Sequence, residues 1–192
     1  MNAIDAIRKR RTIRRYKQEP VADATLLELV EAASLAPSGA NTLPLRYVIA
    51  RTPQLVEQIF MLTAWGGHVK PNRNPVWGVS APAAFIAVCT PQAAANLPLT
   101  HADAGAAIQS ILLRAVELGL GACWLGAFDK QQADKILRFK DMACLYLVAV
   151  GAPGEAPVKE TIKIGESTKY FLDSNDVLHV PKYEADSISE LR

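Results

Sequence analysis

The sequence predicts one α+β domain in which helices flank a central sheet. Two observations predict it. Short strand patterns alternate with helical patterns, and the chain opens with helices rather than with a strand followed by a glycine-rich turn. Neither G-x-G-x-x-G nor G-x-x-x-x-G-K-[ST] occurs, which disfavours a doubly wound nucleotide-binding fold. The 192 residues, 50% of them hydrophobic, suit a single domain that needs no disulfide or metal to hold its core.

Apolar residues recur at helical spacing in five segments, which cover residues 2–10, 23–36, 53–61, 101–118 and the stretch capped by Asp129-x-x-Gln132. The second helix is expected to begin near Asp23 or Thr25, where Thr25-x-x-Glu28 fits a capping box. The helix at 101–118 is apolar on most faces, so it must be buried.

Strands are expected at residues 47–50, 83–89 and 145–150, with a shorter apolar run at 123–125. Residues 64–82 are rich in Gly, Pro and Asn and are expected to form a long loop. The chain from 152 to 192 is expected to form an extended arm or tail of the same domain, reaching over another part of the molecule or over a partner subunit.

The three cysteines lie among apolar residues, which predicts free buried thiols and a reducing compartment, most simply the cytoplasm. The N-terminus is charge-dense where a signal peptide would be apolar, and charged residues interrupt the longest apolar stretch. We therefore expect neither secretion nor a membrane span.

Residues 8–17, RKRRTIRRYK, hold seven of the 21 basic residues and no acid. Arginine forks bind phosphate oxygens through paired, charge-assisted hydrogen bonds. If the segment is extended, Thr12 and Arg14 lie on one side of it. A solvated basic face and a nucleic-acid-binding arm are the alternatives. The net acidic remainder of the chain and the lack of a recognition motif disfavour nucleic acid.

Two further segments combine tight turns with exposed polar groups. In APSGANTLP (36–44), the Asn41 amide can both donate and accept hydrogen bonds, which suits the edge of a heterocycle. In GLGACWLGAFD (119–129), Gly126 permits a close approach of backbone to a flat ligand. Taken singly, each segment also fits an ordinary turn.

In order and spacing, these three segments resemble the FMN-dependent nitroreductase family. The family patterns R-R-[ST]-x-R-x-[FY], A-P-S-x-x-N, D-x-G-x-x-x-Q and G-L-G-x-x-W-[IL]-G all occur, the third as Asp103, Gly105 and Gln109. A strand ending in Gly151-Ala152-Pro153 completes the pattern, so the resemblance covers about residues 4–160.

The resemblance implies a three-layer sandwich with a mostly antiparallel central sheet, which forms an intertwined homodimer with two FMN sites at its interface. It implies NADH or NADPH as electron donor and two-electron, ping-pong reduction of a nitroaromatic or quinone-type acceptor. Hydride passes through flavin N5, so no metal and no catalytic side chain is expected.

The residues implied to bind FMN fall into five groups. They are Arg10, Arg11, Thr12 and Arg14 at the phosphate and ribityl chain; Pro37, Ser38, Gly39 and Asn41 from the other subunit; Leu125 and Gly126 along the ring, with the Gly126 N–H near N5; Lys159 as a late phosphate ligand; and Asn74 at the ring edge.

The chain departs from the family pattern where Leu43 and Leu45 replace a Gln and a Trp that many relatives have. The loop at 64–78 is also distinctive. Its His68 is interpreted as a solvated loop residue, with a role as proton donor as the alternative. These differences leave open another FMN-dependent reaction, such as reductive dehalogenation or flavin fragmentation.

Overall fold

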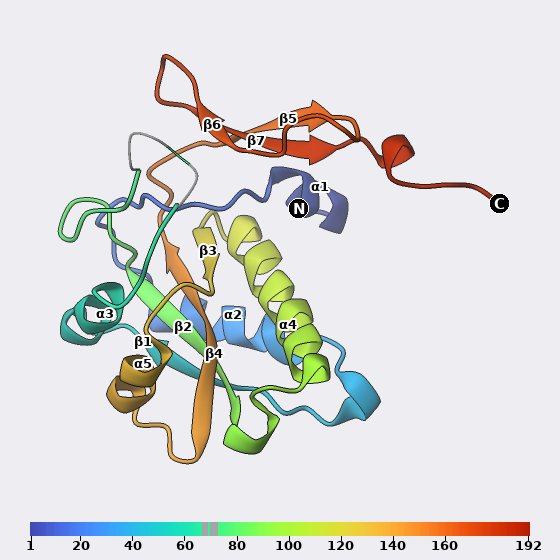
Figure 1. Cartoon of the computed structure of the whole chain (residues 1–192). Coiled ribbons are helices and arrows are strands. Elements are labelled where there is room, and N and C mark those ends of the chain that lie inside the picture. Colours follow the sequence, from blue (N-terminus) through green and yellow to red (C-terminus); the bar gives the residue numbers. More distant parts are fainter. Residues whose placement is uncertain (67–68, 70–72) are drawn as a thin grey trace.

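A four-stranded antiparallel sheet forms the centre of the computed structural model, which describes residues 1–66, 69 and 73–192 (Figure 1). Its strands lie in the order β1-β2-β4-β3, and every neighbouring pair is antiparallel. Their bounds are β1 (Arg46–Ala50), β2 (Ala84–Pro91), β3 (Gly121–Leu125) and β4 (Met142–Gly151). All four predicted strand segments are confirmed. His68 lies outside the described residues.

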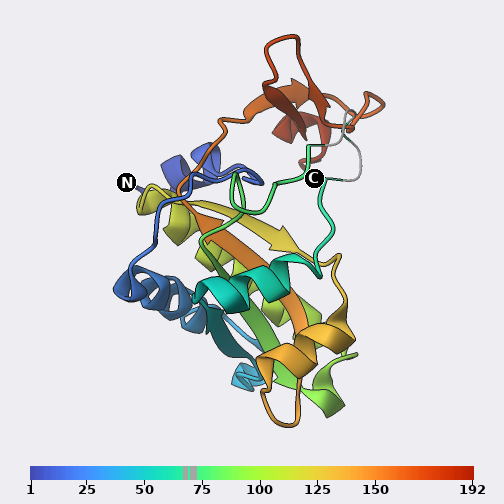
Figure 2. The same ribbon diagram turned by 90° about the vertical axis from the view of Figure 1, so that its left-hand side faces the viewer.

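Helices cover both faces of this sheet, because its central strands are apolar on both sides. Ile86 and Val88 of β2 face α2 (Asp23–Ser34) and α4 (Pro98–Glu117). Phe85 and Ala87 face α3 (Pro53–Phe60) and the N-terminal segment, and α5 (Lys130–Leu137) completes this second layer. Figure 2 shows α3 and α5 in front of the sheet. The predicted three-layer α+β sandwich is confirmed.

The helix ends follow the sequence signals in part. As predicted, the side chain of Asp129 caps α5 by accepting the Gln132 N–H at 3.0 Å. The side chain of Asn2 caps α1 (Ala3–Lys9) in the same way. The capping box at Thr25 is wrong. Helix α2 begins about half a turn earlier, at Asp23, which is the other predicted start, and its N-cap Ala22 makes no side-chain hydrogen bond.

Helix α4 is buried along most of its length, as its sequence predicts. Its inward residues, from Ala104 to Ala115, pack against α2 and the sheet. No helix in the described part of the chain is both long and apolar enough to cross a membrane. The three cysteines are free and buried, which confirms the prediction for them.

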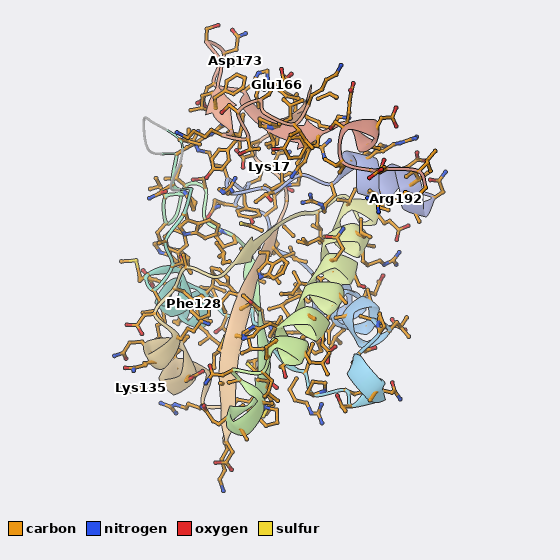
Figure 3. The ribbon with its side chains drawn as sticks, turned by 45° about the vertical axis from the view of Figure 1, so that its right-hand side comes forward. Lys17, Phe128, Lys135, Glu166, Asp173 and Arg192 are labelled. Atoms are coloured by element: carbon orange, nitrogen blue, oxygen red, sulfur yellow. The ribbon has the colours of Figure 1, made fainter. Side chains whose placement is uncertain are left out.

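The C-terminal region forms a second, smaller sheet that the sequence analysis did not foresee. Strands β5 (Val158–Ile162), β6 (Phe171–Leu172) and β7 (Leu178–Tyr183) lie in the order β5-β7-β6, with β5 parallel to β7. This sheet lies beyond α1, at one end of the molecule (Figure 1). Figure 3 shows Glu166 and Asp173 at that end and Lys135 of α5 at the other.

Candidate functional site

The basic segment after α1 is extended and runs beside the start of β3. Thr12 forms a parallel bridge with Ala122, and the Ile13 N–H donates to the Ala122 carbonyl at 3.1 Å. The Ile13 side chain packs directly over Gly121, where a Cβ would lie only 2.8 Å from it. Burial of Ile13 turns its neighbours Thr12 and Arg14 to the opposite side, as the predicted alternation requires.

A basic hollow of about 570 Å³ opens between α1, α4 and the C-terminal sheet. It brings together three of the predicted phosphate ligands, Arg10, Arg11 and Lys159. Its lining is completed by Ile7, Arg8, Gln109 and Lys182, so it contains five cations and no acid. Partial burial lowers the pKa of the Arg10 guanidinium, and burial together with the charge of Arg10 lowers that of Arg11. A bound anion would relieve both effects.

Arg14 lies outside the lining of the basic hollow. Its guanidinium carbon lies 5.2 Å from the ring centroid of Tyr170, in a cation–π contact. Its backbone N–H donates to Oε1 of the buried Glu155 at 2.5 Å. Glu155 also pairs with Arg73 at 3.4 Å. The basic segment is thus fixed between the long loop and the C-terminal sheet.

Asn74 lies close to Arg14, with Gly66 between them. A Cβ on Gly66 would lie 3.9 Å from Arg14 Cδ and 4.0 Å from Asn74 Oδ1. Among the described residues, Asn74 Oδ1 has no hydrogen-bond donor although it is buried. An orphaned buried acceptor fits the donor edge of a bound heterocycle.

The edge of β3 is covered at both ends and open between them. Ile13 covers its start, and beyond its end the Ala64 N–H donates to the Ala127 carbonyl at 2.9 Å. Between these contacts, Leu125 is buried and Gly126 is exposed. Within the described part of the chain, no hydrogen bond uses the Gly126 N–H as donor. The backbone at Gly126 therefore offers a free donor at an uncovered sheet edge.

Sequence reasoning missed an aromatic group beside Gly126. The Tyr146 ring lies 3.7 Å from where a Cβ of Gly126 would be. Its hydroxyl is 3.0 Å from Nδ1 of His101, and its ring meets Trp124 edge to face, 5.1 Å between centroids. Tyr146 and Gly126 are 20 positions apart in sequence, and they become neighbours only through the register in which β3 pairs with β4.

Trp65 and Trp77 of the long loop contact α3. Trp65 is buried, and its indole N–H donates to Thr63 Oγ1 at 2.7 Å. Trp77 and Trp65 both contact the ring of Phe60 on α3. These aromatic side chains hold the loop to α3.

The turn after α2 is sharply wound. Ala40, Asn41 and Leu43 all have positive φ, a conformation that non-glycine residues keep where the surrounding structure fixes it, often at functional sites. The Ser38 hydroxyl accepts the Leu43 N–H at 3.1 Å. At Gly39 a Cβ would lie 2.5 Å from Leu99, so the turn packs tightly on α4.

The family model described as "Nitroreductase family" matches residues 7–152. The chain belongs to the nitroreductase family. It is 29% identical over 163 residues to a Methanothermobacter thermautotrophicus protein whose assigned name is NADH dehydrogenase/NAD(P)H nitroreductase, covering 82% of this chain and 80% of that protein. It is also 43% identical over 54 residues to an iodotyrosine deiodinase from Nematostella vectensis, over 28% of this chain and 20% of that protein.

Solved nitroreductase structures share the fold. A crystal structure from Desulfovibrio desulfuricans, of a protein assigned as a nitroreductase in complex with FMN, superposes with a TM-score of 0.68. It is 30% identical and covers 85% of this chain and 93% of that one. A nitroreductase family protein from Clostridium novyi NT superposes with a TM-score of 0.66 at 22% identity, over 83% of this chain and 89% of that one.

In this member of the nitroreductase family, the turn and the basic hollow contact different faces of α4. The Gly39 N–H donates to Asp103 Oδ1 at 2.9 Å, whereas Gln109 lines the hollow. Six helical residues separate Asp103 from Gln109, which places them about 9 Å apart along the axis and about 120° around it. Figure 1 shows α1 near the end of α4 and the turn near its start. One chain does not bring the two groups of predicted ligands together.

Proposed function

We propose that this protein binds FMN and uses NADH or NADPH to reduce a nitroaromatic or quinone-type acceptor by two electrons. One observation carries the proposal: an acid-free basic hollow lies beside the start of β3, and an unpaired backbone N–H lies at the end of the same strand. A phosphorylated cofactor with a flat ring fits these two features. Family membership and the FMN-bound relative support the choice of FMN.

The residues present fit FMN at each of its parts. Arg10, Arg11 and Lys159 would hold the phosphate, and Thr12 lies on the path from the hollow toward the ring. The buried Asn74 Oδ1 lacks a donor, which the pyrimidine edge of a flavin supplies. Gly126 presents bare backbone against which the ring can lie.

When bound, FMN supplies the redox chemistry, taking a hydride from the nicotinamide and passing two electrons to the acceptor in a separate step. The chain binds, orients and stabilises charge. The Gly126 N–H would donate a hydrogen bond to N5, the position that the resemblance assigns to it, and would stabilise the charge that changes there during transfer. Arg14, which the resemblance assigns to the phosphate and ribityl chain, would add positive charge beside the bound flavin. The Tyr146 ring and Trp124 form an aromatic wall beside the open edge of β3.

The functional unit is a homodimer in this proposal. The turn at 37–41 and the basic hollow contact different faces of α4, and no single hollow in the described part of the chain is lined by both, which supports a flavin shared between two chains. Pro37, Ser38, Gly39 and Asn41 would then approach the flavin held by the partner. Exposed Leu35, Leu43 and Leu99 around the turn supply apolar surface for that contact. We place the protein in the cytoplasm, where its three free thiols stay reduced.

Reductive dehalogenation is the second candidate, supported by the local similarity to an iodotyrosine deiodinase and by Leu43 and Leu45 near the turn. It shares the flavin and differs in the acceptor. Anaerobic assays of the reduced protein with a quinone, a nitroaromatic and a halophenol separate the two reactions.

The purified protein tests the proposal directly. We expect a yellow protein that releases FMN on denaturation, bleaches anaerobically with NADH or NADPH and recovers its colour with a quinone. Sedimentation should show a flavin-loaded dimer at micromolar concentration. A colourless protein that neither takes up added FMN nor bleaches would contradict the proposal, and tight binding of an oligonucleotide by that protein would favour the basic-arm alternative.

A further inference from the structure

The five cations of the basic hollow have no acidic partners. Among the described residues, no carboxylate forms an ion pair with any of the five, which are Arg8, Arg10, Arg11, Lys159 and Lys182. The other two lining residues, Ile7 and Gln109, are uncharged. Clustered cations without acids are unfavourable unless an anion binds among them. The hollow is therefore built for negative charge.

Two arginines outside the hollow, in contrast, are paired with carboxylates. Arg15 pairs with Asp176 at 3.2 Å, and Arg73 lies between Glu155 and Asp176. The chain neutralises its cations with its own carboxylates on that side of the basic segment. The five cations of the hollow have no such carboxylate partners among the described residues.

The charge in the hollow exceeds what one phosphate needs. A phosphate monoester carries at most two negative charges near neutral pH. The family resemblance assigns Arg10, Arg11 and Lys159 to the FMN phosphate, and these three already balance it. Arg8 and Lys182 remain, and no FMN atom is assigned to them. The Arg11 guanidinium also donates to the Arg8 backbone carbonyl at 2.9 Å, which holds this side chain at the end of α1.

The two lysines enter the hollow from one face of the C-terminal sheet. Thr161 of β5 lies opposite Lys182 of β7 in the parallel register. Lys159 is two residues before Thr161, so it lies on the same face as Lys182. Arg8, on the last turn of α1, faces them across the hollow. Arg8 and Lys182 thus flank the phosphate position from two different elements, and the volume of about 570 Å³ leaves room for a larger anion.

We propose that Arg8 and Lys182 bind a second nucleotide phosphate beside the phosphate of FMN. The inference rests on the proposed function and adds a substrate-recognition role for two residues. The second phosphate has two chemical sources: the phosphorylated adenosine half of the nicotinamide donor, or the diphosphate of FAD bound in place of FMN. Both require the same pair of cations.

Calorimetry on FMN-loaded protein tests the donor as source. Adenosine 2′,5′-bisphosphate and adenosine 5′-diphosphate are titrated separately, with adenosine as the uncharged comparison. We expect a phosphorylated nucleotide to bind and adenosine not to bind. Lys182→Gln and Arg8→Gln should each weaken that binding about tenfold. Lys140→Gln, an exposed lysine outside the hollow, should leave it unchanged.

Titration of apoprotein with FMN and FAD tests the second source. Tighter binding of FAD than of FMN, lost in Lys182→Gln, would assign the second phosphate to FAD. The proposal is overturned if FMN-loaded protein binds no phosphorylated nucleotide and FAD binds no more tightly than FMN. It is also overturned if Lys182→Gln and Lys140→Gln behave alike. Failure of the proposed function would show differently, as wild-type apoprotein that does not bind FMN.

Discussion

Glu155 accepts the backbone N–H of Arg14 with its Oε1 atom at 2.5 Å, across 141 positions of sequence. The same oxygen lies 3.2 Å from the Arg15 N–H, and the other carboxylate oxygen lies 3.4 Å from the Arg73 guanidinium. One buried carboxylate thereby fixes the basic segment, the long loop and the start of the C-terminal region to one another.

Removal of this carboxylate should destabilise the fold. Glu155→Ala leaves two backbone donors without their acceptor and the buried Arg73 guanidinium with only the exposed Asp176, so we expect a loss of about 3–5 kcal/mol in the free energy of unfolding. Urea denaturation measures it. Glu190→Ala removes an exposed carboxylate paired with Arg192 and should cost under about 1 kcal/mol. Equal effects of the two substitutions would show that Glu155 does not have this role.

A substitution of Arg10 tests the proposed binding of the FMN phosphate in the basic hollow. Arg10→Ala should weaken FMN binding by about 1.5–3 kcal/mol, the size of a hydrogen bond to a charged group. Titration of apoprotein with FMN measures it. Arg51→Ala is the matched control, because Arg51 is an exposed arginine that pairs with Asp23 outside the hollow. Unchanged FMN affinity in Arg10→Ala would remove Arg10 from the site.

Gly126→Val tests whether Gly126 contacts the flavin or only forms the turn after β3. Gly126 is not among the residues with positive φ, and its Cβ would meet the Tyr146 ring at an ordinary 3.7 Å. The variant should therefore fold and keep much of its FMN affinity. Its side chain should displace the ring from the Gly126 N–H and slow flavin reduction by NAD(P)H about 100-fold.

Stopped-flow bleaching of the flavin measures that rate. Ala127→Val places the same valine side chain at the next exposed position and should reduce its flavin at the wild-type rate. If folded Gly126→Val also bleaches at the wild-type rate, Gly126 serves only the turn.

The C-terminal sheet should loosen as pH rises. His179 bonds Glu160 at 2.5 Å and Asp173 at 3.3 Å, and the bond to Glu160 is the main cause that raises the pKa of His179, against the opposing effect of burial. A raised folded pKa means that the stabilisation is complete below the unfolded value of about 6.5. It is lost as pH rises through the higher folded value.

Amide hydrogen exchange in β5 and β7 should therefore accelerate above pH 6.5, after correction for the intrinsic pH dependence of exchange. His179→Gln should remove that step. An NMR titration that gives His179 a pKa at or below 6.5 would contradict the assignment. Because Lys159 and Lys182 lie on this sheet, FMN affinity should weaken over the same pH range.

The sequence predicted the central sheet and its helices because their signals are local. Strand patterns, turn residues and the cap at Asp129 depend on neighbours within a few positions. Asp129 acts as the predicted cap because its partner is only three residues away. The capping box at Thr25 failed because Asp23 extends the helix by half a turn beyond it.

The remaining features depend on pairing across long separations. Nothing near Lys182 in sequence indicates that β7 pairs with β5 and brings it beside Lys159. Tyr146 is level with Gly126 only through the β3–β4 register. Likewise, Glu155 is an unremarkable acid in sequence, and its role appears only where the chain returns to the basic segment.

The central claim is that one flavin site combines the basic hollow of one chain with the 37–41 turn of another. Mixed dimers test it most directly. Chains carrying Arg10→Ala or Asn41→Gly are given different affinity tags, and the heterodimer is isolated. Glycine suits position 41 because Asn41 has a positive φ. The account predicts that each homodimer binds FMN weakly, while the heterodimer binds one FMN per dimer with native affinity, because one of its sites carries neither substitution. A heterodimer in which both sites are weakened would show that each site lies within one chain and would contradict the account.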